Sequence, residues 1–288
     1  MNKKGIILAG GLGTRLFPLT TVISKQLLPL YDKPMVYYPL GTLMEAGIAE
    51  VMVISTEKDI PRYMELLGNG SDLGMEIRYT IQDKPLGIAQ AIPLTEKFIG
   101  KDSVTLILGD NIFYGEQLNK FLKESDNTKG GHVFAVEVDD ARSYGVIEKD
   151  SFGKVCKIIE KPENPPTNLA VTGLYCYDNN VIEIAKTIRP SKRGELEITD
   201  LNNAYLQKNS LEVCVLDSSN SWFDTGSFES LFKAAAFIKQ TQEKTGKMIG
   251  AIELIAYLNG WITINKLEEI TRKFQNSGYA NKLMSNLT

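Results

Sequence analysis

The stretch "ILAGGLGTRLFPLT", residues 7–20, decides the fold. It is the end of a short apolar run that leads directly into a glycine-rich loop, and Arg15 stands where that loop ends. A short apolar run of this kind is typical of a buried strand. Glycines let backbone N–H groups approach phosphate oxygens, and a guanidinium adds a fork of donors. The loop therefore indicates an anion site, and a tight turn with a surface arginine is the alternative for the loop alone.

Two common glycine motifs do not fit this loop. A dinucleotide fingerprint needs a third glycine where Leu16 stands. A P-loop needs a lysine after its last glycine, and none follows Gly13 at that spacing. The loop is thus a phosphate-binding candidate of a different kind.

Apolar runs and helical patterns alternate along most of the chain. We expect strands at 5–9, 51–55, 76–82, 103–110, 132–138, 154–160, 171–178 and 211–217. We expect helices at 34–47, 60–68 and 87–100, helix alone after about residue 228, and loops at 123–129 ("KESDNTK") and 161–168 ("KPENPPTN"). Such alternation predicts an α/β protein with a mostly parallel sheet covered on both faces.

Composition limits the possible partners. The 288 residues carry a net charge of −3, which gives no general field for nucleic acid or an anionic membrane. Three cysteines, Cys156, Cys176 and Cys214, are too few and too far apart for a disulfide framework. The most apolar late stretch contains Glu253 and Asn259 and is too interrupted to span a bilayer. We expect a cytoplasmic protein with neither nucleic acid nor membrane as a partner.

The residues after the loop carry a resemblance. "SKQLLPLYDKPM" (24–35) follows it, and further motifs come in the order "LGDNIFYG" (108–115), "YGVIE" (144–148), "EKP" (160–162), "VTGLYCYD" (171–178), "RGELEITDLN" (193–202) and "WFDTG" (222–226). This series resembles the sugar nucleotidyltransferase family, most closely its short bacterial glucose-1-phosphate thymidylyltransferase branch. The resemblance covers almost the whole chain and weakens after about residue 246.

The resemblance implies a fold and a reaction. The fold is a Rossmann-like central sheet, the nucleotide-diphospho-sugar transferase fold, with residues 1–240 as the nucleotidyltransferase domain and 241–288 as a C-terminal helical extension packed on it. In the reaction, glucose 1-phosphate attacks the α-phosphorus of dTTP, and dTDP-glucose and pyrophosphate form with the help of Mg²⁺. The alternatives are a uridylyl- or cytidylyltransferase on the same fold, or a nucleotide-binding regulatory module without catalysis.

The resemblance also implies roles for individual residues. The catalytic residues are Arg15, Lys25 and Lys161, and the metal ligands are Asp110 and Asp224. The nucleotide site is Leu8, Gly10, Gly11, Gly13, Thr14, Arg15, Lys25, Gln82, Gly87 and Asp110. The sugar-phosphate site is Asn111, Gly145, Glu160, Lys161, Val171 and Tyr175. Asp110 also stands out on its own, because it ends an apolar run and ligands of open parallel sheets bind beyond the carboxyl ends of strands. For Lys33, a phosphate contact and a solvated loop lysine are equally open.

The tail suggests assembly. Residues 248–270 are apolar for the end of a finished domain, and apolar area with no core to enter usually marks a subunit contact. Together with the resemblance, this predicts a homotetramer. The resemblance also implies a second, regulatory site near the loop after Asp110 ("NIFYGEQL", 111–118), with Tyr114 and Gly115 as candidates and dTDP-rhamnose as a feedback inhibitor.

Overall fold

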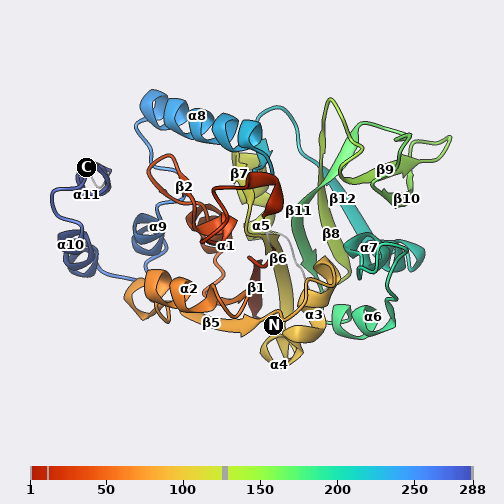
Figure 1. The fold of residues 1–288 in the computed structure, drawn as a ribbon, viewed down its shortest axis with the longest axis horizontal. Helices are drawn as coiled ribbons and strands as arrows, with labels where there is room; N and C mark the ends of the chain where they lie inside the picture. The colour runs from red at the N-terminus through yellow and green to blue at the C-terminus, as the bar shows by residue number, and fades with distance from the viewer. Residues whose placement is uncertain (1, 12, 125–128, 287–288) are drawn as a thin grey trace.

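The chain folds around a mixed nine-stranded sheet with helices on both faces (Figure 1). This is a computed structural model that describes residues 2–11, 13–124 and 129–286. In Figure 1, α8 runs along the top, and the last helices gather at the left, away from the antiparallel part of the sheet. The predicted class, an α/β fold with C-terminal helices, is confirmed.

The first half of the sheet is parallel, in the order β5-β4-β1-β6. Its strands are β1 (Lys3–Leu8), β4 (Glu50–Ser55), β5 (Glu76–Ile81) and β6 (Ser103–Leu108). β1 is central, because Ile7 pairs with Val53 on one side and with Ile107 on the other. The carboxyl ends of these strands therefore meet at one edge, where the glycine-rich loop begins.

The second half is largely antiparallel. Its strands are β8 (Gly131–Glu137), β9 (Gly145–Lys149), β10 (Val155–Glu160), β11 (Leu169–Tyr177) and β12 (Leu211–Val215). β11 runs antiparallel to β6 and also pairs with β8 and β9, so it joins the two halves. β9 was not predicted from the sequence, whereas the other four were.

Two small antiparallel pairs lie outside the main sheet. They are β2 (Pro29–Leu30) with β3 (Lys33–Pro34), and β7 (Asn111–Tyr114) with β13 (Ser221–Asp224). The segment after Asp110 was expected to be a loop, and this expectation was wrong. A segment as short as β7 cannot show a periodic pattern, and its pairing partner lies far along the chain.

Eleven helices belong to the described part of the chain. They are α1 (Tyr37–Glu45), α2 (Ile60–Leu67), α3 (Ala91–Leu94), α4 (Glu96–Ile99), α5 (Glu116–Glu124), α6 (Val181–Thr187), α7 (Ile198–Gln207), α8 (Phe228–Thr245), α9 (Ile252–Leu258), α10 (Ile264–Lys273) and α11 (Gly278–Ser285). Short 3₁₀ turns are η1 (Thr14–Leu16), η2 (Lys25–Leu27), η3 (Ser71–Leu73) and η4 (Ile88–Gln90).

Two of the helix and loop predictions differ from the structure. The single helix expected at 87–100 is divided into η4, α3 and α4. The expected loop at 123–129 begins with the last two residues of α5, and its residues 125–128 lie outside the described residues. No helix among the described residues is both long and apolar enough to cross a membrane.

Alternation along β1 divides the core into two clusters. Ile6 packs with residues of α3, α6 and α7, whereas Ile7 packs with residues of α1, α2 and α9. Successive side chains of a strand point to opposite faces, so one short apolar strand anchors helices on both sides of the sheet.

The apolar tail packs inside its own chain. Residues 252–256 of α9 are buried against α1, and a Cβ on Gly41 would lie 3.1 Å from the Cα of Gly250. The reason given for a subunit contact, that this segment has no core to enter, is therefore wrong. A sequence pattern shows that a helix has an apolar face but does not show which surface covers it.

This packing predicts a difference between two neighbouring substitutions. Ile255→Ala should lower the free energy of unfolding by about 2–4 kcal/mol, because Ile255 is 8% exposed and its loss leaves a cavity. Leu258→Ala, on the same helix but 70% exposed, should change it by less than about 0.5 kcal/mol. Urea denaturation measures both, and equal losses would contradict an intrachain role for α9.

Candidate active site

The glycine-rich loop lies at the carboxyl ends of β1 and β6. The Leu8 carbonyl accepts a hydrogen bond from the N–H of Gly109 at 2.9 Å, and this bond joins the two strand ends. Gly13 has a φ of +57°, and its carbonyl accepts from the Thr20 hydroxyl at 2.8 Å. The loop then turns into η1, where Thr14 and Arg15 are exposed.

Strand β13 brings Asp224 beside Asp110. In the β7–β13 pair, Asp224 lies opposite Asn111. The next residue, Thr225, donates to the Asp110 carbonyl from its N–H at 3.1 Å and from its hydroxyl at 2.8 Å. The two predicted metal ligands are therefore held together by backbone pairing as well as by a side chain.

The carboxylates repel each other, and two cations compensate. Burial and the nearby Asp110 raise the pKa of Asp224 above its usual value, whereas Lys25 and Arg15 act in the opposite direction. The Lys25 ammonium pairs directly with the Asp110 carboxylate, and its side chain is only 9% exposed. The guanidinium of Arg15 lies against Gly226, where a Cβ would come within 2.6 Å of it.

This arrangement fits a divalent metal of the hard, oxygen-preferring kind. Across residues 2–11, 13–124 and 129–286, no group of three or more His, Cys, Asp or Glu side chains could hold a metal by itself. Asp110 and Asp224 would thus supply two oxygen ligands, and water and ligand phosphate would complete the shell. Mg²⁺ in particular keeps several waters and is usually bound through one or two carboxylates plus phosphates.

A cavity of about 180 Å³ opens next to the two carboxylates. All six predicted sugar-phosphate residues line it, namely Asn111, Gly145, Glu160, Lys161, Val171 and Tyr175. Arg15, Asp110 and Asp224 line the same cavity. The structure therefore brings the predicted sugar, metal and phosphate residues to one place.

A polar cluster surrounds Glu160 at the rim. The Thr199 hydroxyl donates to its carboxylate at 2.5 Å, Arg193 donates at 3.3 Å, and the ammonium of Lys161 lies 3.6 Å away. Lys161 has a φ of +43°, which is rare for a residue other than glycine and costs of order 1–3 kcal/mol. Its N–H donates to the Tyr144 carbonyl at 2.9 Å, so the neighbouring turn holds this conformation.

The floor of the cavity is oriented by hydrogen bonds. The side-chain carbonyl of Asn111 accepts from the indole of Trp222 at 2.7 Å and from the N–H of Gly173 at 3.0 Å. Thr172 Oγ1 and Asn202 Nδ2 are buried, and neither has a hydrogen-bond partner among the residues that the structure describes. Buried polar groups are normally satisfied, so a bound ligand or water is the natural partner of these two.

Sequence reasoning missed several residues of this cavity. They are Ser143, Tyr144, Thr172, Thr199, Asn202 and Trp222, with Arg193 at the rim. All but Ser143 lie within motifs quoted for the resemblance, which was the only available signal. Their position in a motif did not reveal that they face the same cavity as Glu160.

The predicted base-binding residues lie on the other side of the loop. Gln82 is buried, and its side-chain amide donates to the side chain of Gln90 at 2.7 Å. A Cβ on Gly10 would lie 2.7 Å from the side-chain oxygen of Gln82. Gly87 has a φ of +107°, and a Cβ on it would collide with the Leu196 carbonyl. Gly11, with a φ of +149°, meets nothing within 4 Å. Glycine is required at Gly87, because the Leu196 backbone lies so close and because φ is positive there.

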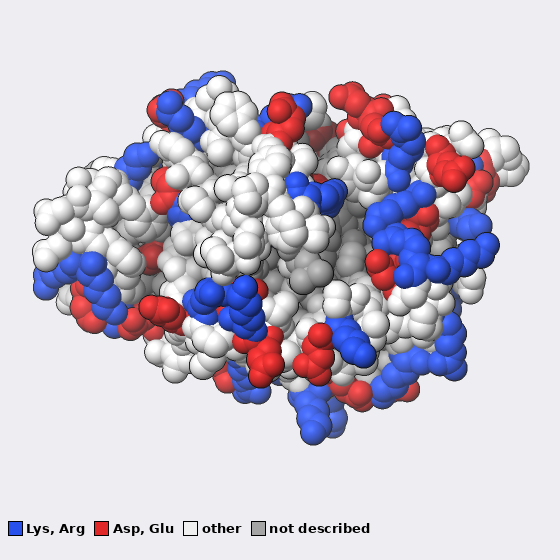
Figure 2. Space-filling model, in the orientation of Figure 1, with Lys and Arg blue, Asp and Glu red and all other residues white. Residues whose placement is uncertain are grey.

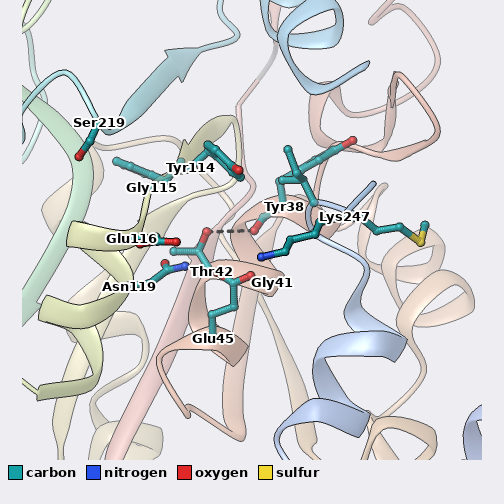
Figure 3. A pocket seen from close by; sticks show the side chains of 14 residues that line it. Tyr38, Gly41, Thr42, Glu45, Tyr114, Gly115, Glu116, Asn119, Ser219 and Lys247 are labelled. Atoms are coloured by element: carbon teal, nitrogen blue, oxygen red, sulfur yellow. Dashed lines mark hydrogen bonds between the residues drawn. The ribbon is translucent and has the colours of Figure 1, made fainter. Parts of the chain in front are cut away.

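A second cavity, of about 460 Å³, lies at the far end of β7 (Figure 3). Tyr114 and Gly115, the two candidates for a regulatory site, line it. Glu45 and Lys247 also point into this region in Figure 3. Burial raises the pKa of Glu45, although a hydrogen bond from Asn119 at 2.8 Å opposes this shift.

Charges of both signs alternate on the surface. Figure 2 shows acidic and basic side chains interspersed over one face, with a larger group of Lys and Arg at the right, beside β9, β10 and α7. No single-sign field dominates that face, in agreement with the net charge of −3. An anionic ligand would therefore have to be attracted by individual cations, for which Arg15, Lys25 and Lys161 are the predicted candidates.

An α/β fold with a glycine-rich loop, two strand-end carboxylates and several convergent cations is suited to joining phosphorylated ligands. Comparison with known proteins defines the class. The family model described as nucleotidyl transferase matches residues 4–241, and the chain belongs to this family.

Relatives extend over almost the whole chain. A glucose-1-phosphate thymidylyltransferase of Neisseria meningitidis is 49% identical over 282 residues, which cover 98% of each chain. One from Mycobacterium tuberculosis is 48% identical over 281 residues, again 98% of each. A Bacillus anthracis structure assigned as the same enzyme has a TM-score of 0.76 at 40% identity, covering 82% of this chain and 94% of that one. A UDP-glucose pyrophosphorylase structure has a TM-score of 0.72 at 25% identity, covering 84% and 100%.

The carboxylate pair generates a prediction. Asp110→Asn and Asp224→Asn should each lower nucleotidyl transfer at least about tenfold. The unfolding midpoint of Asp224→Asn should be unchanged or raised, because the substitution removes a carboxylate whose charge is disfavoured by burial and by Asp110. Turnover and thermal unfolding measure the two effects.

Asp140→Asn is the control for both variants, since Asp140 is exposed and its ion-pair partner among the described residues is the nearby Arg142. It should leave turnover unchanged. If either site variant retained more than about a tenth of the wild-type rate, the chemistry would not depend on that carboxylate.

Proposed function

We propose that this protein is a glucose-1-phosphate thymidylyltransferase, which converts dTTP and glucose 1-phosphate to dTDP-glucose and pyrophosphate. One observation carries the proposal. Arg15, Asp110, Asp224 and Lys161 line the same cavity as Glu160, so phosphate-binding and sugar-binding groups adjoin. The names of the relatives supply the particular substrates.

The proposed reaction is a direct displacement. An oxygen of the sugar phosphate forms a bond to the α-phosphorus of dTTP, the bond to the bridging oxygen breaks, and pyrophosphate leaves with the electron pair. No protein nucleophile takes part. In this scheme Arg15 and Lys25 neutralise the triphosphate, and Lys161 holds the sugar phosphate so that two anions stay in contact.

The proposed cofactor is Mg²⁺, held by Asp110 and Asp224. When bound, it neutralises charge on the triphosphate oxygens. In this structure Lys25 pairs with Asp110 and compensates its charge. If Mg²⁺ took over that compensation, the Lys25 ammonium would be free to bind phosphate oxygens.

Specificity is proposed to come from two sets of polar groups. Glu160 would accept hydrogen bonds from sugar hydroxyls, and its orientation is set by Thr199 and Arg193. Gln82 can both donate and accept, which matches the carbonyl and N–H groups of thymine. In this scheme the backbone at Gly87 would lie along the edge of the base.

A substrate panel tests the proposal. Pyrophosphate release should be fastest with dTTP and glucose 1-phosphate among dTTP, UTP, CTP, ATP and GTP, each combined with glucose, galactose and glucosamine 1-phosphates. A uridylyl- or cytidylyltransferase would prefer UTP or CTP. A regulatory module without catalysis would bind dTTP and release no pyrophosphate with any sugar phosphate.

We also propose that the protein is a cytoplasmic homotetramer. Phe228 and Phe232 on α8 are 50% and 71% exposed, and adjacent aromatic side chains in solvent favour a protein contact. Light scattering at micromolar concentration should give about four times the chain mass of 32.0 kDa. A cytoplasmic location is supported by the small number of cysteines, three in 288 residues.

The second cavity is proposed to bind an end-product nucleotide sugar such as dTDP-rhamnose. Its volume of about 460 Å³ lies within the range of small-molecule sites. Tyr114→Ala should raise the inhibition constant for dTDP-rhamnose about tenfold or more, since it removes an aromatic wall of the cavity. Tyr114→Phe, which keeps the ring, is the matched control. Inhibition that was purely competitive with dTTP and unchanged by Tyr114→Ala would contradict this site.

A further inference from the structure

Lys33 is buried, although the sequence leaves a solvated loop position open. Its side chain is 2% exposed, and its ammonium pairs with Asp32 at 2.5 Å. The ammonium also lies over the ring of Tyr38 at 5.1 Å and over that of Tyr279 at 5.6 Å. A lysine placed between two aromatic rings and a carboxylate is held on several sides.

The other groups around Lys33 come from the C-terminal helices. Tyr279 on α11 donates to Glu253 on α9 at 2.5 Å, and Glu253 is 3% exposed. Gln242 on α8 donates to Asp32 at 2.9 Å and accepts from the N–H of Ile249 at 2.9 Å. Three helices of the C-terminal region therefore meet at the turn between β2 and β3.

The charges in this cluster depend on one another. Burial lowers the pKa of Lys33, and the carboxylates of Asp32 and Glu253 oppose this shift. Burial likewise raises the pKa of Glu253, which the charge of Lys33 opposes. Lys282, whose ammonium donates to the Tyr31 hydroxyl at 3.3 Å, adds a second cation nearby. Removing Lys33 would leave Asp32 without the cation it pairs with and Glu253 with the hydrogen bond from Tyr279 but without the opposing charge of Lys33.

Lys33 and Lys25 lie on the two arms of one hairpin. The N–H of Val36 donates to the Gln26 carbonyl at 2.8 Å, and the N–H of Met35 donates to the Leu28 carbonyl at 2.9 Å. These bonds continue the β2–β3 ladder toward η2, which begins at Lys25. A displacement of the Lys33 arm is therefore transmitted to the Lys25 arm through backbone hydrogen bonds.

We propose that Lys33 is a positioning residue, through which α9 and α11 hold the hairpin and so keep Lys25 against Asp110. Lys33 itself contacts no substrate in this scheme. The inference rests on the proposed function, because that function gives Lys25 its role at the triphosphate. The C-terminal helices would then contribute to catalysis without lining the cavity beside Asp110 and Asp224.

The test compares Lys33→Met with Lys4→Met. Lys4 is a matched control, because it lies 3.4 Å from Glu50, 3.5 Å from Asp102 and 5.0 Å from the ring of Phe98, on the opposite end of β1 from the site. Both variants should lose stability. Only Lys33→Met should also lower kcat, by about tenfold, since small displacements of a catalytic group have large effects on rate. The KM for glucose 1-phosphate should stay within about twofold of wild type, because Lys161 and Glu160 lie outside the hairpin.

Hydrogen exchange gives a readout that does not need turnover. Amides of residues 26–36 should exchange about tenfold faster in Lys33→Met than in wild type, and not in Lys4→Met. If wild type released no pyrophosphate from dTTP, the proposed function would fail, and the exchange result would still decide the structural link. If Lys33→Met and Lys4→Met behaved alike in both exchange and kcat, the positioning role would be wrong.

A double variant separates positioning from stability and guards against a poorly folded single variant. Lys33→Met with Glu253→Gln removes the cation together with the buried carboxylate, while the side-chain amide that replaces the carboxylate would still accept from Tyr279. The unfolding midpoint should recover relative to Lys33→Met. The kcat should stay low, because the anchor of the hairpin is still missing. Recovery of kcat in parallel with stability would overturn the proposal.

Discussion

The pairing of β13 with β7 is the contact on which the site depends. It places Asp224 opposite Asn111 and lets Thr225 bond the Asp110 carbonyl. It also delivers Trp222, whose indole orients the Asn111 side chain. Two strands of four residues thereby add Asp224 and Trp222 to the site at the carboxyl ends of the parallel strands. Lys25 and Arg15 are needed as compensating charges because this pairing brings two carboxylates together.

The long apolar strands and the ordered motifs could be predicted from the sequence. β1, β4 and β6 each contain a run of branched apolar residues, so the existence of these strands follows from the sequence pattern, whereas their order in the sheet does not. The resemblance then named residues that the structure brings to one cavity, such as Glu160 and Val171. Their roles in binding remain predictions, since placement alone does not test them.

The rest depends on partners distant in sequence. β7 and β13 are too short to show a period, and α9 shows an apolar face without showing that α1 covers it. Lys33 in "DKP" gives no sign of burial, because its surroundings come from helices more than two hundred residues later. Arg193 and Thr199 face Glu160 only once β10 and α7 have packed together. Each of these features is set by tertiary contacts that no local pattern encodes.

Strand β7 connects the two cavities. Asn111 at its start lines one, and Tyr114 at its end lines the other. A ligand that displaced β7 at one end would change the shape of the cavity at the other end. Thermodynamic linkage requires such an effect to be reciprocal. If a ligand in the larger cavity weakened binding in the smaller cavity by some factor, a ligand in the smaller cavity would weaken binding in the larger cavity by the same factor. The four residues of β7 would then couple the two binding equilibria.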